Sequence, residues 1–307
     1  MWRNLVGVNL TGSWPDLLHS TSNWVEDHRQ HFCIQNTPCR TRQIDLLKPL
    51  GELALSCGVV LHSQDKKLHS RITTLLEWCW SELTDGNFLA GVIRDHPELI
   101  VLSSIYATFY EIGFRCQSVE DEIRFAFSMA GIKAIEFPAW RRLDVLTALS
   151  KLNVEHCEDI SAVVDRTWLG ARPEPWMLSD GAAYSVTHTV FYVTDFGRLP
   201  RALSSSYSEY LRRWVPVWLR YYSHTDNLDL LSEFIMVQGC LEQDTMESWC
   251  ELLSARQSSS GAIPGPKHGG QLLMVGENDA ERKVFFEDYH TTLVTMMASA
   301  MSIRRIA

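Results

Sequence analysis

The sequence predicts an all-α protein, and three observations support this fold class. Apolar residues recur at spacings of three and four through most of the 307 residues, which is the period of an amphipathic helix. No segment alternates apolar and polar residues for long enough to build a sheet. The sequence has no strict repeat of the kind that would indicate a solenoid, which favours a closed barrel of helix hairpins. We therefore expect about 10 to 13 helices, paired antiparallel and closed into an α/α toroid.

The first half of the chain divides into an arm and the start of the helical domain. Residues 1–41 have little periodicity, although Pro15 to Gln30 could form a helix capped by Ser13, and we treat them as an arm packed on a single domain of residues 42–307. The next helix contains Pro49 and Gly51, which predict a break into two pieces. Further helices are expected at 69–84, 97–113, 118–131, 141–152 and 160–170.

The second half continues the helical pattern after a Pro-rich connector. The expected helices are 179–197, 204–224 with a kink at Pro216, 227–241, 247–257 and 288–303. Residues 258–284 are rich in Gly and Pro and predict one long loop.

Composition and charge exclude several classes of partner. The net charge of −9 comes from 28 basic and 37 acidic residues spread along the chain, so we expect no nucleic acid. No apolar run approaches the roughly 20 residues of a membrane span, and the first residues do not form a secretory signal. We expect no membrane partner and a cytoplasmic location, with the eight cysteines as reduced core thiols.

The helix expected at 179–197 carries polar residues where a plain core helix has none. Tyr184, His188 and Asp195 lie at i, i+4 and i+11, so at about 100° per residue they share one stripe. His188 and Asp195 are about 10 Å apart along the axis at roughly 1.5 Å per residue, so they cannot bond directly. They could flank a ligand or meet through His290. We predict His188, Asp195, His290 and Tyr184 as catalytic residues for acid/base chemistry; the alternative is a core histidine with satisfied hydrogen bonds.

Further side chains are candidates for substrate binding. We expect the polar stripe to line a cavity in the helical domain. Thr187 and Thr194 could offer hydroxyls to this cavity, although buried hydroxyls often bond only a carbonyl one turn back. Tyr289 precedes His290 at the start of the last helix. Arg166 and Trp176 flank the Pro-rich connector and could stack on or bind a substrate, or simply pack.

Two late motifs resemble the α/α toroids of terpenoid cyclases and of protein prenyltransferase β subunits. In LSARQSSSGAIP, Gln257 and Gly261 match their pattern of a helix ending in Gln and followed by Gly, with Ile263 at the aromatic position. FFEDYHTTL is similar to the opening of the last inner helix of prenyltransferase β subunits. In that family the histidine, here His290, is a zinc ligand. Its Asp-x-Cys partner is missing from this sequence, so we predict no metal and no cofactor, with zinc at His290 as the alternative.

The segments RTWLG, PEPW, YSVTHTVFYVTDFG and YLRRWVPVWL look like those of an uncharacterised actinobacterial family often encoded near natural-product genes. The resemblance covers about residues 45 to 300. This resemblance by itself gives no activity. From the polar stripe and the toroid-like ending we predict an enzyme of bacterial specialised metabolism that acts on a small, mostly apolar, possibly carrier-borne substrate as a cyclase, transferase or hydrolase. The alternative is a non-catalytic ligand-binding or scaffold protein of the same pathway. The oligomeric state stays open.

Overall fold

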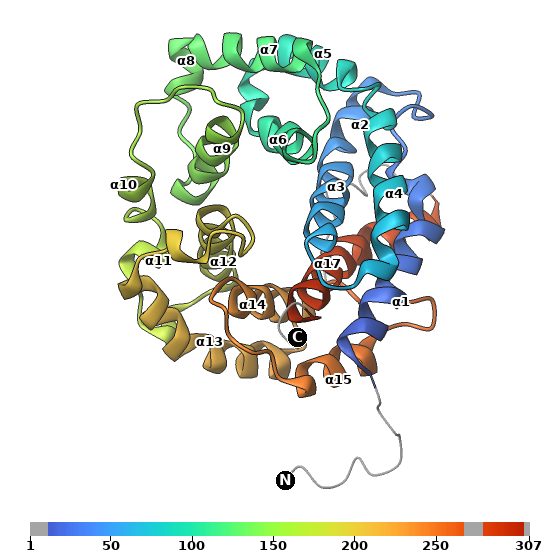
Figure 1. The fold of residues 1–307 in the computed structure, drawn as a ribbon, viewed down its shortest axis with the longest axis vertical. Coiled ribbons are helices and arrows are strands. Elements are labelled where there is room, and N and C mark those ends of the chain that lie inside the picture. Colours follow the sequence, from blue (N-terminus) through green and yellow to red (C-terminus); the bar gives the residue numbers. More distant parts are fainter. Residues whose placement is uncertain (1–11, 267–278, 304–307) are drawn as a thin grey trace, which may run out of the picture.

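Six helices form a closed cycle of contacts at the centre of the protein. In the computed structural model, which describes residues 12–266 and 279–303, each of these helices packs on the next and the last returns to the first (Figure 1). In order they are α3 (Leu47–Leu61), α6 (Ser103–Ile112), α9 (Ala139–Lys151), α12 (Asp180–Thr194), α14 (Leu228–Cys240) and α17 (Ala280–Ile303). Residues far apart in the sequence therefore face each other across this inner ring.

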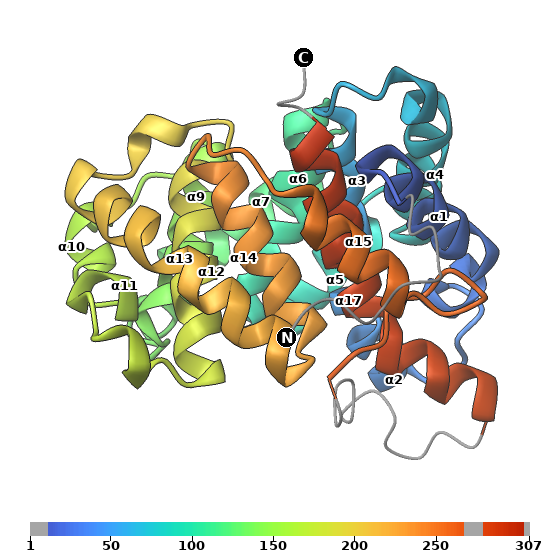
Figure 2. The same cartoon turned by 90° about the horizontal axis from the view of Figure 1, so that it is seen from below.

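A second set of helices covers the inner ring from outside. Helix α4 packs on α3, α13 on α14 and α1 on α17, as Figures 1 and 2 show. The longer outer helices are α1 (Trp14–Asp27), α4 (His69–Glu82), α5 (Asn87–Asp95), α7 (Gln117–Ser128), α13 (Ser205–Thr225) and α15 (Glu247–Arg256). The described residues contain no strand, so the predicted all-α class is confirmed.

The described chain has more helices than the ten to thirteen expected, because four short ones lie within connections. They are α2 (Arg40–Asp45), α8 (Ala130–Lys133), α10 (Ile160–Val164) and α11 (Trp168–Ala171). Short 3₁₀ segments, including Pro97–Leu102 and Pro175–Met177, also lie in connections. Helices of four to six residues bury too few apolar positions to produce a readable period.

The predicted break at Pro49 and Gly51 is wrong. Both residues lie inside the continuous helix α3. Pro49 is the third residue of that helix, where a backbone N–H has no partner within the helix, so its missing donor costs little. Gly51 allows α6 to approach, since a Cβ atom there would lie 2.7 Å from Cγ1 of Ile105. The predicted cap at Ser13 is confirmed, because its hydroxyl accepts a hydrogen bond from the Asp16 amide.

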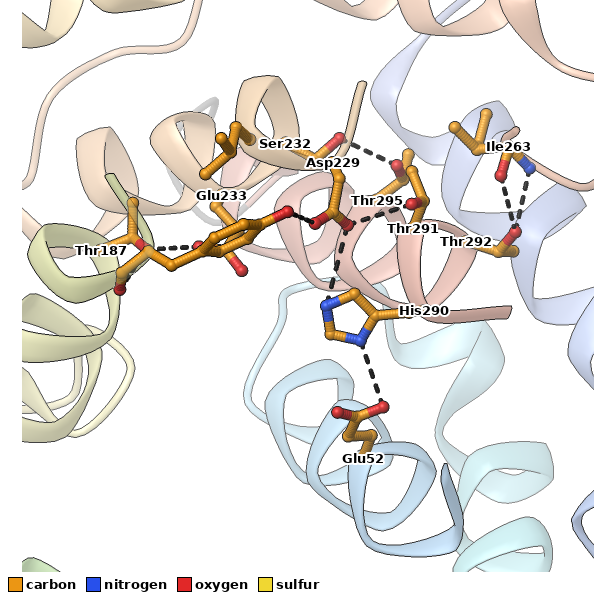
Figure 3. A network of polar contacts seen from close by, with 12 residues as sticks. Glu52, Thr187, Asp229, Ser232, Glu233, Ile263, His290, Thr291, Thr292 and Thr295 are labelled. Carbon is orange, nitrogen blue, oxygen red and sulfur yellow. Dashed lines mark hydrogen bonds and ion pairs between the residues drawn. The ribbon is translucent and has the colours of Figure 1, made fainter. Parts of the chain in front are cut away.

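Helix α14 is the most enclosed element of the inner ring. All thirteen of its residues are buried, including Asp229, Ser232 and Glu233. It lies between α12, α13 and α17, so no face is left for solvent. The Ser232 hydroxyl lies 2.9 Å from that of Thr295 and joins α14 to α17 (Figure 3). Acidic residues on such a helix need partners within the protein.

Some expectations concern segments that the structure describes only in part. Residues 1–11 of the expected arm and 267–278 of the expected long loop lie outside the described residues. Within the described part, no helix is both long and apolar enough to cross a membrane. All eight cysteines are free thiols; Cys57, Cys79, Cys240 and Cys250 are buried as expected, whereas Cys39 and Cys157 are exposed.

Candidate functional site

The candidate site is built around two buried acids on α14. Asp229 and Glu233 lie four residues apart and therefore on the same face of the helix, and each side chain is only 2% exposed. Both carboxylates point toward His290 of the neighbouring helix α17 (Figure 3). Burying two carboxylates side by side is unfavourable unless nearby groups donate hydrogen bonds or carry positive charge.

Asp229 accepts hydrogen bonds from two hydroxyls that come from two other helices. The Tyr184 hydroxyl of α12 donates to Oδ2 at 2.6 Å, and the Thr291 hydroxyl of α17 donates to Oδ1 at 3.0 Å. Burial, followed by the negative charge of Asp229, raises the pKa of Tyr184 far above its usual range. Tyr184 therefore stays neutral and acts as a donor to Asp229.

His290 links this group to a third acid, Glu52 of α3. Its Nδ1 atom lies 3.1 Å from Oε2 of Glu52, and its Nε2 atom lies 3.8 Å from Oδ1 of Asp229. Burial opposes the charged imidazolium, but Glu52 and Asp229 outweigh it and raise the pKa of His290 to about 9. Burial likewise opposes the Glu52 carboxylate, yet His290 lowers its pKa to about 2. At neutral pH the imidazolium thus balances part of the acidic charge.

Glu233 is held differently from Asp229. Its Oε2 atom accepts a hydrogen bond from the Thr187 hydroxyl of α12. Burial and the nearby charge of Asp229 raise its pKa well above the ordinary value for a glutamate. Glu233 is therefore suited to hold a proton at neutral pH and to give it up to a basic partner.

His188 lies beside Glu233 and is the uncharged base of the group. Its Nδ1 atom lies 2.9 Å from the Tyr184 carbonyl oxygen, which only accepts hydrogen bonds, so Nδ1 carries the proton and Nε2 carries the lone pair. Burial, followed by the positive charges of His290 and Arg141, lowers the pKa of His188 to about 4. The side chains of Glu52, His188 and His290 keep between 23% and 33% of their surface accessible, so these three residues are only partly buried.

The structure places Asp195 apart from Tyr184 and His188. It follows the last residue of α12 with a positive φ of 49°, and its carboxylate pairs with Lys151 and Arg198 at 2.6 Å each. Arg198 and Lys151 also bind Glu111. These side chains line a separate pocket with Leu55, Val59 and Met301. A carboxylate at a helix C-terminus is unfavourable because of the helix dipole, and the positive charges of Lys151 and Arg198 offset this effect at Asp195.

The remaining predicted residues take several positions. Thr187 binds Glu233, and Tyr289 is buried among aromatic rings with its hydroxyl contributing to the low pKa of Glu52. The Thr194 hydroxyl donates a hydrogen bond to the carbonyl of Val190, one turn back, in the last turn of α12. The side chains of Arg166 and Trp176 are exposed, Trp176 by 79%, and do not contact the buried group.

Sequence reasoning missed Glu52, Asp229 and Glu233. Each is an acid within a strongly apolar helical segment, GELALSC or LDLLSEFIM. Acids are almost never fully buried without a partner, so an acid flanked by apolar residues on every helical face is the signal that could have found them. The pairing with His290 was not readable, because it depends on α17 returning to α3.

The chemistry of this group also fits a cation. Ligand atoms of Asp229, Glu233 and His290 all lie within 4.8 Å of one another. Carboxylate oxygen and imidazole nitrogen are common ligands of divalent metal ions. Zinc at His290 was only the alternative in the sequence analysis, because the Asp-x-Cys pair is missing; in the structure Asp229 and Glu233 lie beside His290.

Comparison with known proteins gives one match. No curated protein and no solved structure matches the chain. The profile of the family described as "Domain of unknown function (DUF6895)" matches residues 18–300. These residues contain the inner helices α3 to α14, most of α17 and every side chain of the candidate site. The chain therefore belongs to the DUF6895 family.

Proposed function

We propose that the protein is an enzyme acting by acid/base chemistry on a small, mostly apolar substrate, and that its active site is the group of Glu52, Tyr184, His188, Asp229, Glu233 and His290. The closed cycle of six inner helices with outer partners supports an α/α toroid of the kind found in terpenoid cyclases and prenyltransferase β subunits. A role in bacterial specialised metabolism, in the cytoplasm, is part of the same proposal.

One observation carries the proposal: His188 and Glu233 lie side by side in the inner ring, in surroundings that favour a neutral histidine and a protonated carboxyl. His188 has a lowered pKa and Glu233 a raised pKa, and His188 Nδ1 is 3.6 Å from Glu233 Oε2. Environments that push two titratable groups to unusual pKa values are typical of acid/base sites. In this arrangement His188 accepts a proton through Nε2, Glu233 donates one, and the cationic His290 stabilises negative charge on the substrate.

The rings around His188 indicate the character of the substrate. Trp140, Phe191 and Tyr192 lie with their ring centroids 5.1 to 5.9 Å from that of the imidazole. An apolar molecule bound here would pack against these rings and place a single polar group near Glu233. Cyclisation, transfer and hydrolysis are all compatible with one acid and one base.

A second candidate function is ligand binding without turnover. The hydroxyls of Tyr184, Thr187 and Thr291 already satisfy the buried carboxylates within the chain. Such preformed hydrogen bonds are also expected in the ligand site of a binding or scaffold protein of the same pathway.

The two functions differ in what the protein does to small molecules. Purified wild type, His188→Gln, Glu233→Gln and the surface control His96→Gln are incubated with bacterial extract and followed by untargeted mass spectrometry. Wild type and the control are expected to consume one mass and form another, with a loss of about 100-fold or more in the two site variants. Equal conversion by all four proteins contradicts the assigned roles. A molecule that is retained but not converted supports binding alone.

A further inference from the structure

Three side chains of the candidate site lie close enough together to bind the same metal ion. We propose that Asp229, Glu233 and His290 bind one divalent transition-metal ion, of which Zn²⁺ is the test case. This goes beyond the proposed enzyme, because cation binding is measured without turnover and stands or falls separately.

The helices hold the three ligands in one place. Asp229 and Glu233 project from the same face of α14, and His290 projects from α17, which packs closely along α14. Because all thirteen residues of α14 are buried, its side chains have little freedom to turn away. Ligands on packed helices are positioned more rigidly than ligands on loops.

The spacing of the ligand atoms fits a shared ion better than a direct hydrogen bond. Nε2 of His290 is 3.8 Å from Oδ1 of Asp229, beyond hydrogen-bonding distance. Two ligands that each lie about 2.1 Å from an ion are about 3.4 Å apart at a tetrahedral angle. The observed separation therefore needs only a small movement of either side chain to receive an ion.

Each ligand is oriented by a second group, as in known metal sites. Glu52 accepts a hydrogen bond from Nδ1 of His290, which turns Nε2 toward the two carboxylates (Figure 3). Tyr184 and Thr291 orient Asp229, and Thr187 orients Glu233. A carboxylate behind a ligating histidine is a common outer-shell partner, since it fixes the ring and increases its basicity.

The surroundings of Asp229 and Glu233 also favour a bound cation. Within the described residues no lysine or arginine pairs with Asp229 or Glu233; Asp229 lies beside the cationic His290, and Glu233 lies beside His188, which is uncharged. The hydrogen bond from Thr187 uses Oε2 of Glu233 and leaves Oε1 available to a ligand. A divalent ion would supply the missing positive charge and could bind this oxygen.

One nitrogen and two oxygen ligands favour Zn²⁺ or Mn²⁺ over Mg²⁺, which is usually bound through oxygen and water. The ion would replace the protons that His290 and Glu233 hold in the metal-free chain, so in the metal-bound protein the ion, rather than Glu233 and the charged His290, would supply the positive charge and the acid character. His188 is not a ligand in this arrangement and remains the uncharged base beside it.

The experiment measures Zn²⁺ and Mn²⁺ binding to the EDTA-treated full chain by calorimetry and by metal analysis after dialysis. One ion per chain is expected for wild type and for Asp195→Asn, a buried carboxylate outside the group. Glu233→Gln and Asp229→Asn should each weaken binding by at least about 100-fold. Glu52→Gln keeps all three ligands and should weaken it by about 10- to 100-fold through the orientation of His290. Circular dichroism verifies that each variant is folded.

A Co²⁺-substituted sample distinguishes this site from the exposed thiols of Cys39 and Cys157. Ligation by oxygen and nitrogen gives weak visible bands only, whereas thiolate ligation adds a strong near-ultraviolet charge-transfer band. Weak bands that are lost in Glu233→Gln, and that need a higher Co²⁺ concentration in Glu52→Gln, support the site. The proposal is overturned if wild type binds neither Zn²⁺ nor Mn²⁺ at millimolar concentration, if the band is that of thiolates, or if binding is unchanged in Glu233→Gln and Asp229→Asn.

Discussion

Nδ1 of His290 lies 3.1 Å from Oε2 of Glu52, although 238 positions separate the two residues in the chain. The contact joins the first inner helix to the last one and sets the charge state of the site. With EDTA-treated protein, Glu52→Gln should lower the pKa of His290 from about 9 toward or below its ordinary value, because the carboxylate charge that favours the imidazolium is removed. NMR titration of the ring protons measures this. Glu98→Gln, beside the exposed His96, is the matched control and should leave His290 unchanged.

The Tyr184 hydroxyl is expected to stabilise the fold through Asp229. Tyr184→Phe removes one donor to a carboxylate that is 2% exposed, so the free energy of unfolding should fall by about 1–3 kcal/mol. Urea denaturation measures the loss. Tyr221→Phe, at a tyrosine that is 54% exposed, should change stability by less than about 0.5 kcal/mol. If Tyr184→Phe were as stable as wild type, the hydrogen bond from Tyr184 to Asp229 would not stabilise the fold.

The close approach of α3 to α6 depends on Gly51. A Cβ atom there would lie 2.7 Å from Cγ1 and 2.8 Å from Cδ1 of Ile105, so Gly51→Ala should cost about 1–3 kcal/mol of stability. The double variant Gly51→Ala/Ile105→Ala should lose less than the sum of the two single losses, because the clash is gone. Gly131→Ala, where no atom lies within 4 Å of the added carbon, is the control and should not destabilise. Strict additivity of the two losses would contradict the clash.

Asp144 of α9 should make stability depend on pH. Burial raises its pKa to about 6 despite Arg141, whereas the unfolded value is near 3.8. The folded state therefore holds the proton more tightly between these values, and stability from this group falls as pH rises from about 4 to 6. Relative to Asp144→Asn, which cannot titrate, wild type should lose up to about 3 kcal/mol over that window. Urea denaturation of both proteins at pH 4, 5, 6 and 7 measures the difference, which would stay constant if the pKa were ordinary.

The sequence predicted the helices well because their apolar period is local information. The break at Pro49 was wrong since proline is tolerated in the first turn of a helix. The stripe of Tyr184, His188 and Asp195 assumed a helix that continues to Asp195, but the chain leaves the helix there, and Lys151 and Arg198 take up the carboxylate.

His290, His188 and Tyr184 were predicted as site residues, and the structure brings these three together with acids that the sequence analysis passed over. Glu52, Asp229 and Glu233 each belong to a residue type that usually faces solvent. Their burial follows from packing on every side of α14 and from the contact of α3 with α17, neither of which is written in a local pattern.

Closure of the inner ring also constrains how the protein can mature during synthesis. Helix α17 joins α14, α3 and α1, and it follows all three of them in the chain, so it leaves the ribosome after them. Until then the faces of those helices that pack on α17 are uncovered, which is when long-range folds are prone to aggregate. His290 arrives with the same helix, so no nascent chain can hold a complete site before α17 has been synthesised.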